Sequence, residues 1–196
     1  SETTFVFPPE YEQTRKVRIF TPTLEVPFAG HPNIGTAFAL AQDGAFGDID
    51  EPINVVFEEK AGFVPVSIRY DDSQQLWCEL AAPAMLSIGG AISSEFISSI
   101  LCLDPDDIVT TTHQPQVASV GLPFLLVEVS SINALRRAEI DMVHLNTLAA
   151  QLGVSYIHMY FKSDDHFDIR ARMFAPMDGV PEDPATGSAN CALIAL

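Results

Sequence analysis

The chain has 196 residues, of which 47% are hydrophobic and 18% are charged, and its mean hydropathy is +0.20. This composition is typical of a globular protein with a sizeable core, and the length suits one large domain or two small ones. Ten basic residues against 26 acidic residues give a formal net charge of −16, which disfavours nucleic acid and anionic membrane surfaces as partners. The longest apolar run, about 118–129, is interrupted by Gly121 and Pro123 and is too short to cross a bilayer.

The cysteines and the two ends of the sequence give two further expectations. Cys78, Cys102 and Cys191 are odd in number and lack the spacing of a metal site, which favours reduced thiols and a cytoplasmic location. The sequence begins without methionine in a strand-like run, and it stops inside an apolar helical pattern. We therefore expect a chain that is truncated at both ends.

The first half predicts strands around one buried helix. Two β-rich runs, 3–7 and 16–20, are separated by a loop that contains Pro8 and Pro9. Residues 33–42 predict a short helix that is apolar or small on nearly every side, so we expect it to be buried on all faces. The remaining predictions for this half are strands at 53–57, 63–68 and 76–79 and an amphipathic helix at 91–101.

The second half predicts a similar set of elements. Residues 105–107 and 110–116 are typical of a linker, and we place the boundary between an N-terminal lobe, 1–113, and a C-terminal lobe, 114–196. No GxSxG, Walker or GxGxxG pattern occurs. The elements predicted here are strands at 124–129, 155–161 and 167–174 and a helix at 144–152.

Three segments of the first half recur in the second half in the same order. Ser1 to Phe20 and Ser155 to Phe174 both span 19 positions, so the first two matches keep their spacing. The repeat predicts an α+β fold of two pseudo-symmetric lobes, each a β-barrel-like sheet around a central helix. The matched segments are SETTFVF (1–7) with SYIHMYF (155–161), VRIFTP (17–22) with RARMFAP (170–176), and HPNIGTAFAL (31–40) with DPATGSANCA (183–192).

The third match repeats an unusual helix entrance. Proline in the first turn places His31 and Asp183 at the predicted N-caps, where aspartate is common and histidine is rare, so His31 lacks an ordinary structural explanation. The free N–H groups and the positive dipole end of a helix attract anions, so two entrances that face each other could hold one small carboxylate. Gly187 would let the ligand approach the backbone, and Ser188 would add a hydroxyl donor.

Glu2 is the candidate for proton transfer, because a carboxyl group can be tuned toward neutral pH by its surroundings. Its match in the second half is Tyr156, so the two halves are not chemically equivalent. Taken alone, such a glutamate is more often a solvated carboxylate at a strand end. His144, His158 and His166 lack paired-ligand spacing, and we interpret them as core or surface histidines rather than metal ligands.

The segments SETTFV, VRIFTPTLEVPFAGHPNIGTA and PEDPATGSANC resemble the signatures of the phenazine-biosynthesis isomerase-like family. That family is similar in fold to diaminopimelate epimerase, and the resemblance covers essentially the whole chain. It implies two similar lobes, each a sheet around a central helix, with the active site in the cleft between them. It also implies that the chain lacks an opening strand and helix before Ser1 and closing strands after Leu196.

The resemblance also implies roles for individual residues. Glu2 would be the general acid and base, and His31, Asp183 and Ser188 would line the substrate pocket and assist proton transfer. We expect Gly30 and Gly187 to bind substrate with Ser188 at the helix entrances. The phenazine enzyme of the family moves a proton on dihydro-hydroxyanthranilate without metal or organic cofactor, and the family implies a homodimer.

We therefore predict a cofactor-independent, cytoplasmic isomerase that moves a proton on a small carboxylate-bearing metabolite. Two alternatives remain open: an epimerase of a modified amino acid on the same scaffold, and a non-catalytic member that binds a metabolite. A racemase with two catalytic thiols is disfavoured, because the entrances hold His31 and Asp183 and because Cys191 lies about two turns into its helix.

Overall fold

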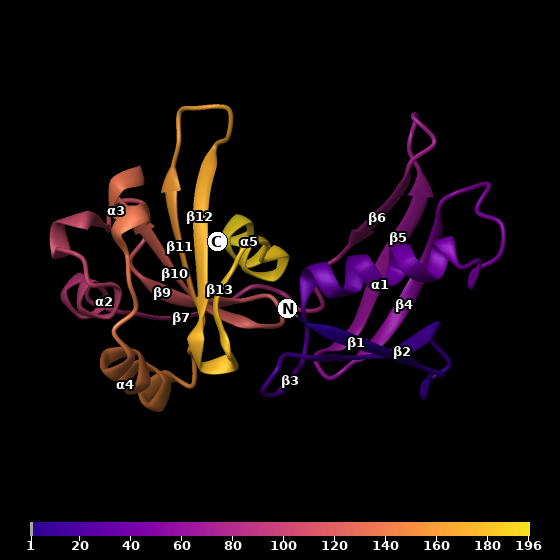
Figure 1. Cartoon of the computed structure of the whole chain (residues 1–196), viewed down its shortest axis with the longest axis horizontal. Helices are drawn as coiled ribbons and strands as arrows, with labels where there is room; N and C mark the ends of the chain where they lie inside the picture. The colour runs from indigo at the N-terminus through magenta and orange to yellow at the C-terminus, as the bar shows by residue number, and fades with distance from the viewer. Residues whose placement is uncertain (1) are drawn as a thin grey trace. The chain divides into compact units, whose positions relative to one another are not determined.

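The computed structural model describes residues 2–196, which form two curled β-sheets and few helices (Figure 1). The predicted α+β fold with two sheets is confirmed. By proximity of residues the chain divides into two units. The first unit contains the chain up to Met85 together with 120–122 and 185–191, and the second contains 86–119, 123–184 and 192–196.

Residues 86–113 were predicted in the N-terminal lobe, and they belong to the second unit. Strand β7 (Ser87–Ala91) pairs with β9 (Gln116–Ser119), and helix α2 (Ser94–Leu101) packs in the core of the second unit. The pattern of apolar residues did not reveal that 86–113 belong to the second unit, because tertiary contacts decide which strands pair with each other. The lobe limits 1–113 and 114–196 themselves stay a prediction.

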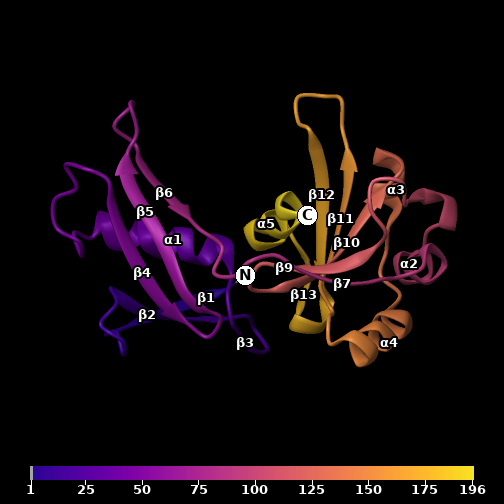
Figure 2. The same ribbon diagram turned by 180° about the vertical axis from the view of Figure 1, so that it is seen from behind.

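The first sheet is a mixed sheet with helix α1 (Gly30–Gln42) against one face (Figure 2). Its neighbours are antiparallel except for one short parallel pairing of β2 with β4. The core between α1 and the sheet holds apolar side chains from alternate positions such as Val64, Val66 and Ile68. The strand order is β1 (Thr3–Phe7), β2 (Arg15–Phe20), β4 (Ile53–Glu59), β5 (Gly62–Tyr70) and β6 (Leu76–Leu80), with β3 (Glu25–Val26) paired to β2.

The prediction that helix α1 is buried on all faces is wrong among the residues that the structure describes. Helix α1 buries one face, which includes Pro32, Asn33 and Thr36. Its opposite face, with Gly35 and Phe38, is exposed. A helix rich in glycine and alanine presents little apolar surface, so the absence of polar residues did not require full burial.

The second sheet has its longest apolar strand at its centre. Strand β10 (Pro123–Val129) is buried on both faces, which explains its continuous apolar run. Helices α2, α3 (Ile132–Arg137) and α4 (Met142–Leu152) share one core with this strand (Figure 1). Among residues 2–196 no helix is long and apolar enough to span a membrane. The strand order is β13 (Val180–Asp183), β12 (Ile169–Ala175), β11 (Ile157–Lys162), β10, β9 and β7, with β8 (Ile108–Val109) paired to β10.

The sequence repeat is confirmed in the strand registers. In the first sheet β1 pairs with β2 so that Thr3 lies opposite Phe20. In the second sheet β11 pairs with β12 so that Ile157 lies opposite Phe174. These are the positions that the sequence alignment matches, so the two hairpins were copied with their register intact.

The third matched segment does not keep its correspondence. The next strand places Val26 opposite Ile19 in the first sheet and Asp183 opposite Met173 in the second, so Asp183 takes the place of Val26 and not of His31. Asp183 ends β13, and helix α5 begins only at Gly187 (Gly187–Ala195), so the predicted N-cap role of Asp183 is wrong. Pro184 follows Asp183, and its missing N–H ends the strand pairing there.

Arg172 ties three elements of the second unit together. Its Nη1 donates to the carbonyls of Leu135 and Ala138 at 2.8 and 3.0 Å, at the end of α3. Its Nε and Nη2 donate to the carboxylate of Glu182 in β13, both at 2.8 Å. The last carbonyls of a helix have no partner within the helix, so Arg172 completes the C-terminus of α3.

We predict that Arg172→Met lowers the free energy of unfolding by about 2–3 kcal/mol, because two partly buried carbonyls lose a charged donor. Glu182→Gln removes only the partly exposed ion pair and should cost less than about 1 kcal/mol. Urea denaturation of both variants beside the unchanged protein measures the two losses. Equal losses would show that the ion pair, and not the carbonyl contacts, carries the stability.

Candidate active site

The start of α1 presents backbone donors without a side-chain cap. Its N-cap is Ala29, which makes no side-chain hydrogen bond, so the predicted capping role of His31 is wrong. Gly30, His31 and Pro32 are the first three helical residues. Pro32 fits at the third position, because none of the first-turn N–H groups has a partner inside the helix. The first turn also lacks an acidic side chain, so nothing in this helix compensates the positive end of its dipole.

Glu2 and His31 are in contact. Glu2 directly precedes β1, and its Oε2 lies 3.2 Å from Nε2 of His31. The Glu2 side chain is 14% exposed and the His31 side chain 44% exposed. A carboxyl group and an imidazole at this distance can exchange or share a proton. The structure therefore brings together two of the three residues predicted to be catalytic.

Two threonine hydroxyls fix β1 to α1 beside this pair. The Oγ1 atoms of Thr4 and Thr36 are 2.9 Å apart, and Thr36 also donates to the carbonyl of Pro32 at 2.7 Å. Sequence reasoning missed both threonines, although Thr4 follows Glu2 on the same face of its strand. Their contact fixes the distance between the segment that carries Glu2 and the helix that carries His31.

A pocket of about 350 Å³ opens beside the Glu2–His31 pair. Small residues on the exposed face of α1, such as Gly35, leave this space open. The pocket is lined by Glu2, Thr4, Val6, His31, Pro32, Gly35, Thr36, Ala39 and Leu40. A small metabolite could therefore reach both members of the pair from one side.

The start of α5 meets the start of α1 backbone to backbone within the first unit. A Cβ atom added to Gly30 would lie 3.0 Å from the backbone N of Ser188 and 3.3 Å from Cα of Gly187. A Cβ atom at Gly187 would lie 3.8 Å from the backbone N of His31. A side chain at Gly30 would therefore be crowded against the backbone of α5 and would force the two helix starts apart. The sequence alignment matched Gly35 with Gly187, whereas the contact is made by Gly30.

A second pocket, of about 480 Å³, lies where these helix starts meet. His31 lines this pocket as well as the first one, so its imidazole connects the Glu2 carboxyl group to the two helix starts. The pocket is lined by Gly30, His31 and Ile34 from α1, by Cys78, Glu79 and Leu80 from β6, and by Ala185, Gly187, Asn190 and Cys191.

Two thiols in this pocket were not assigned to the site from sequence. Cys78 lies in β6 and Cys191 in α5, and no sequence spacing could reveal that they line one cavity. Burial raises the pKa of the Cys78 thiol and that of the Cys191 thiol. Both groups are therefore protonated at neutral pH and do not provide a thiolate base.

The remaining predicted residues lie in two places. Ser188 is buried in α5, 4% exposed, with its backbone N facing Gly30. Asp183 ends β13 in the second unit and is 7% exposed. Its part in proton transfer stays a prediction. Among residues 2–196 no group of three or more His, Cys, Asp or Glu side chains is arranged to hold a metal ion.

Comparisons with known proteins agree on one family. A family model described as "Phenazine biosynthesis-like protein" matches residues 1–196. A trans-2,3-dihydro-3-hydroxyanthranilate isomerase of Pseudomonas aeruginosa is 32% identical over 190 residues, which cover 96% of this chain and 62% of the relative. The solved structure of a phenazine biosynthesis protein of the PhzF family from Bacillus anthracis matches with a TM-score of 0.80 at 23% identity, covering 98% of this chain and 64% of that one. The structure of a predicted epimerase of Pseudomonas aeruginosa matches with a TM-score of 0.79 at 27% identity, covering 99% and 65%.

The chain spans less than two thirds of the length of these relatives. The structural matches at TM-scores near 0.8 support the two-lobed fold that the sequence repeat predicted. Since the family model matches from the first residue to the last, the chain belongs to the family of phenazine biosynthesis-like proteins.

Proposed function

We propose that this chain is part of an isomerase that moves a proton on a small carboxylate-bearing metabolite without a cofactor. The observation that carries the proposal is the 3.2 Å contact between Glu2 and His31, beside pockets of a size that suits a small metabolite. The name of the relative from Pseudomonas aeruginosa, a trans-2,3-dihydro-3-hydroxyanthranilate isomerase, supports both the reaction class and the carboxylate in the substrate.

The helix starts explain how an acidic protein could bind an anion. The formal net charge of −16 repels a carboxylate at long range. Where α1 and α5 meet, however, two positive dipole ends of about half a charge each repel one another. A substrate carboxylate near Gly30 and Gly187 relieves that repulsion, and backbone N–H groups donate to it. Ser188 supports this site through its position beside Gly30.

The proposed proton transfer uses one base that returns the proton it takes. Glu2 abstracts a proton from a carbon next to a conjugated system, and the electron pair of the broken C–H bond moves into that system. Glu2 then delivers the proton to another carbon of the substrate, so that the double bond migrates and atoms and charge balance. His31 holds the second oxygen of Glu2 during both steps. The low exposure of Glu2 favours return of the same proton over its loss to water.

A second candidate function is the epimerisation of a modified amino acid. The observation in its favour is that Cys78 and Cys191 line the same pocket as His31. Thiol chemistry of this kind requires one thiolate, and burial raises the pKa of both thiols. The two functions differ in outcome, because an epimerase inverts one carbon whereas an isomerase moves a double bond.

The partners and location of the whole protein remain predictions. The resemblance implied a homodimer and a cytoplasmic location, and the net charge disfavours nucleic acid. We propose a small carboxylate-bearing substrate as the ligand of this site.

Glu2→Gln should lower the rate of isomerisation by about 10²–10⁴-fold, because the amide cannot accept the proton. The assay follows deuterium uptake and double-bond migration in the full-length protein, with trans-2,3-dihydro-3-hydroxyanthranilate as the first substrate. Glu51→Gln, which removes an exposed carboxylate of the same type, is the matched control and should retain the full rate. Undiminished turnover in the Glu2 variant would show that Glu2 is not the base.

Gly30→Ala and Gly35→Ala form a matched pair within α1. The first adds a methyl group 3.0 Å from the backbone of Ser188 and should lower the free energy of unfolding by about 1–3 kcal/mol while raising KM. The second meets nothing within 4 Å and should be neutral or stabilise the helix by up to about 1 kcal/mol. Denaturant titrations compare the stability of the two variants, and steady-state kinetics measures the KM of the Gly30 variant. Similar behaviour of the two variants would contradict the close approach of α1 and α5.

Substitution of both Cys78 and Cys191 by serine distinguishes the isomerase from the epimerase. If Glu2 is the base, the double variant should keep its turnover within about threefold, since the proposed proton transfer uses neither thiol. Turnover can be followed by the same deuterium uptake. Loss of all exchange in the double variant, with the fold retained, would favour the thiol-based epimerase.

A further inference from the structure

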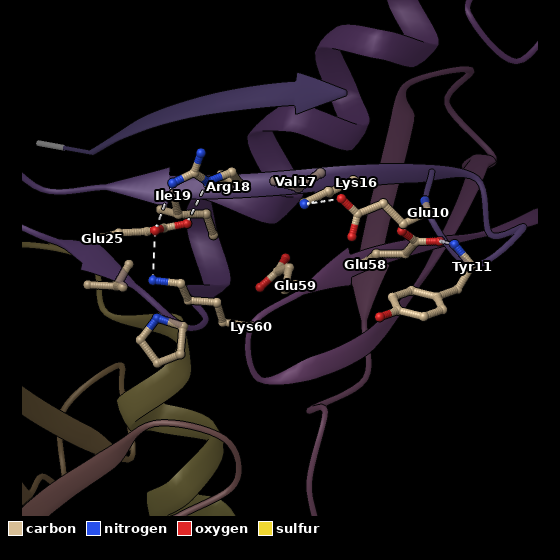
Figure 3. A pocket seen from close by; sticks show the side chains of 12 residues that line it. Glu10, Tyr11, Lys16, Val17, Arg18, Ile19, Glu25, Glu58, Glu59 and Lys60 are labelled. Atoms are coloured by element: carbon tan, nitrogen blue, oxygen red, sulfur yellow. Dashed lines mark hydrogen bonds and ion pairs between the residues drawn. The ribbon is translucent and has the colours of Figure 1, made fainter. Parts of the chain in front are cut away.

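The short strand β3, which precedes helix α1, lies beside a gap in the first sheet. One edge of β2 is occupied by β1 along residues 16–20, so β4 and β3 share the other edge. Strand β4 pairs with β2 at Arg15 and Lys16, and β3 pairs with it further along, at Ile19 and Phe20. A cavity of about 370 Å³ is lined by residues of all three strands (Figure 3). Backbone pairing therefore gives β3 little support.

The carboxylate of Glu25 in β3 connects the two sides of this gap. Its Oε1 accepts from Nε of Arg18 in β2 at 2.8 Å, and its Oε2 accepts from Nη2 of the same guanidinium at 2.9 Å. Nζ of Lys60, the first residue after β4, lies 2.7 Å from Oε2. Figure 3 shows Arg18 and Lys60 reaching the carboxylate from opposite sides. We call these three side chains the Glu25 bridge.

The Glu25 bridge differs from an ordinary surface ion pair, which contributes little. The Glu25 side chain is only 13% exposed, and its contact with Arg18 is bidentate. The hydrogen bonds from Arg18 and from Lys60 hold the pKa of the Glu25 carboxyl group at about 2, against the opposing effect of burial. The carboxylate is therefore ionised at neutral pH, and the bridge does not titrate there.

A backbone contact holds the same segment to the same turn. The carbonyl of Pro27 accepts the N–H of Ala61 at 3.0 Å, and Ala61 directly follows Lys60. The turn after β4 thus binds this segment twice, once through the Lys60 side chain and once through its own backbone. Together with Arg18, these contacts fix residues 25–27 between β2 and the end of β4.

The segment held in this way runs directly into the candidate active site. Phe28 is fully buried in the core of the first unit. Ala29 is the N-cap of α1, and its carbonyl accepts Nδ2 of Asn33 at 3.0 Å. Gly30 and His31 are the next two residues. Because each residue from Val26 to His31 is paired, buried or helical, a shift of Glu25 would move the helix start with it.

We propose that Glu25 is a positioning residue of the candidate active site, which fixes the segment that places His31 against Glu2 through its bridge to Arg18 and Lys60. This inference rests on the proposed function, because the groups that are positioned are those of the proposed site. A displacement of about 1 Å at a reacting group can lower a rate by about 10²-fold, so a residue without contact to substrate can affect turnover.

The first experiment does not depend on turnover. Glu25→Gln sets an amide N–H₂ group against one of the two cations, so the bridge should open. The ring signals of His31, recorded by NMR in the full-length protein at neutral pH, should then shift. Glu10→Gln is the matched control, because Glu10 pairs with Lys16 at 2.6 Å in the same cavity but lies outside the segment that leads to α1. Its His31 signals should stay in place.

Two further variants keep this experiment decisive if Glu25→Gln folds poorly. Arg18→Met and Lys60→Gln each remove one cation from a partly exposed side chain and leave the carboxylate in place. Both should shift the His31 signals, and Arg18→Met should do so more, because it removes two of the three contacts. His31 signals that stay unchanged in all folded variants would overturn the proposal.

The second experiment separates positioning from stability by steady-state kinetics. Loss of folded protein alone lowers the apparent kcat at unchanged KM, because the remaining molecules are native. Displacement of Gly30 and His31 in folded Glu25→Gln should lower kcat by about tenfold and also raise KM by about threefold or more. The double variant with Arg18→Met should be no worse than Glu25→Gln, since both changes open the same bridge.

The outcomes distinguish this inference from the proposed function. An unchanged KM in Glu25→Gln, or additive effects in the double variant, would overturn the positioning role while the proposed function stands. If the His31 signals depend on Glu25 and no substrate is turned over by the unchanged protein, the proposed function fails while the positioning role stands.

Discussion

The candidate site depends on the absence of a side chain at Gly30. A Cβ atom there would lie 3.0 Å from the backbone N of Ser188, so a side chain at this position would push the starts of α1 and α5 apart. That contact is unfavourable in electrostatic terms, because it sets two positive dipole ends together. The unfavourable arrangement is the reason to expect an anion there, since a bound carboxylate offsets the repulsion.

Helix α1 makes most of the contacts around this site, because its successive residues touch different neighbouring elements. Gly30 meets α5, and His31 meets Glu2 at 3.2 Å. Asn33 donates to the carbonyl of Ala29 at 3.0 Å, and Thr36 lies 2.9 Å from the hydroxyl of Thr4 in β1. A displacement of the helix start would therefore change the distance between the proposed base and its imidazole partner, which is why residues remote from the chemistry can affect its rate.

Much of the fold could be predicted from local patterns. Alternating or continuous apolar runs predicted β1, β4 and β10, and the repeat predicted two equivalent hairpins, whose registers the structure shows to correspond. The elements that were missed are short or irregular. Strands β3 and β8 have two residues each, too few for any period, and β13 contains a proline. The alignment of His31 with Asp183 failed because it relied on similar letters across loops of different length.

The sequence by itself determined the family and the duplicated hairpins, because both can be recognised from the order of neighbouring residues. Only the tertiary structure decided that Gly30 rather than Gly35 touches Gly187 and that Cys78 and Cys191 line one pocket. The residues of each contact lie far apart along the chain, and the two glycines compared, Gly30 and Gly35, are both in the first half of one helix. Their contacts follow from how helices and strands pack, and packing depends on all side chains at once and leaves no local signal.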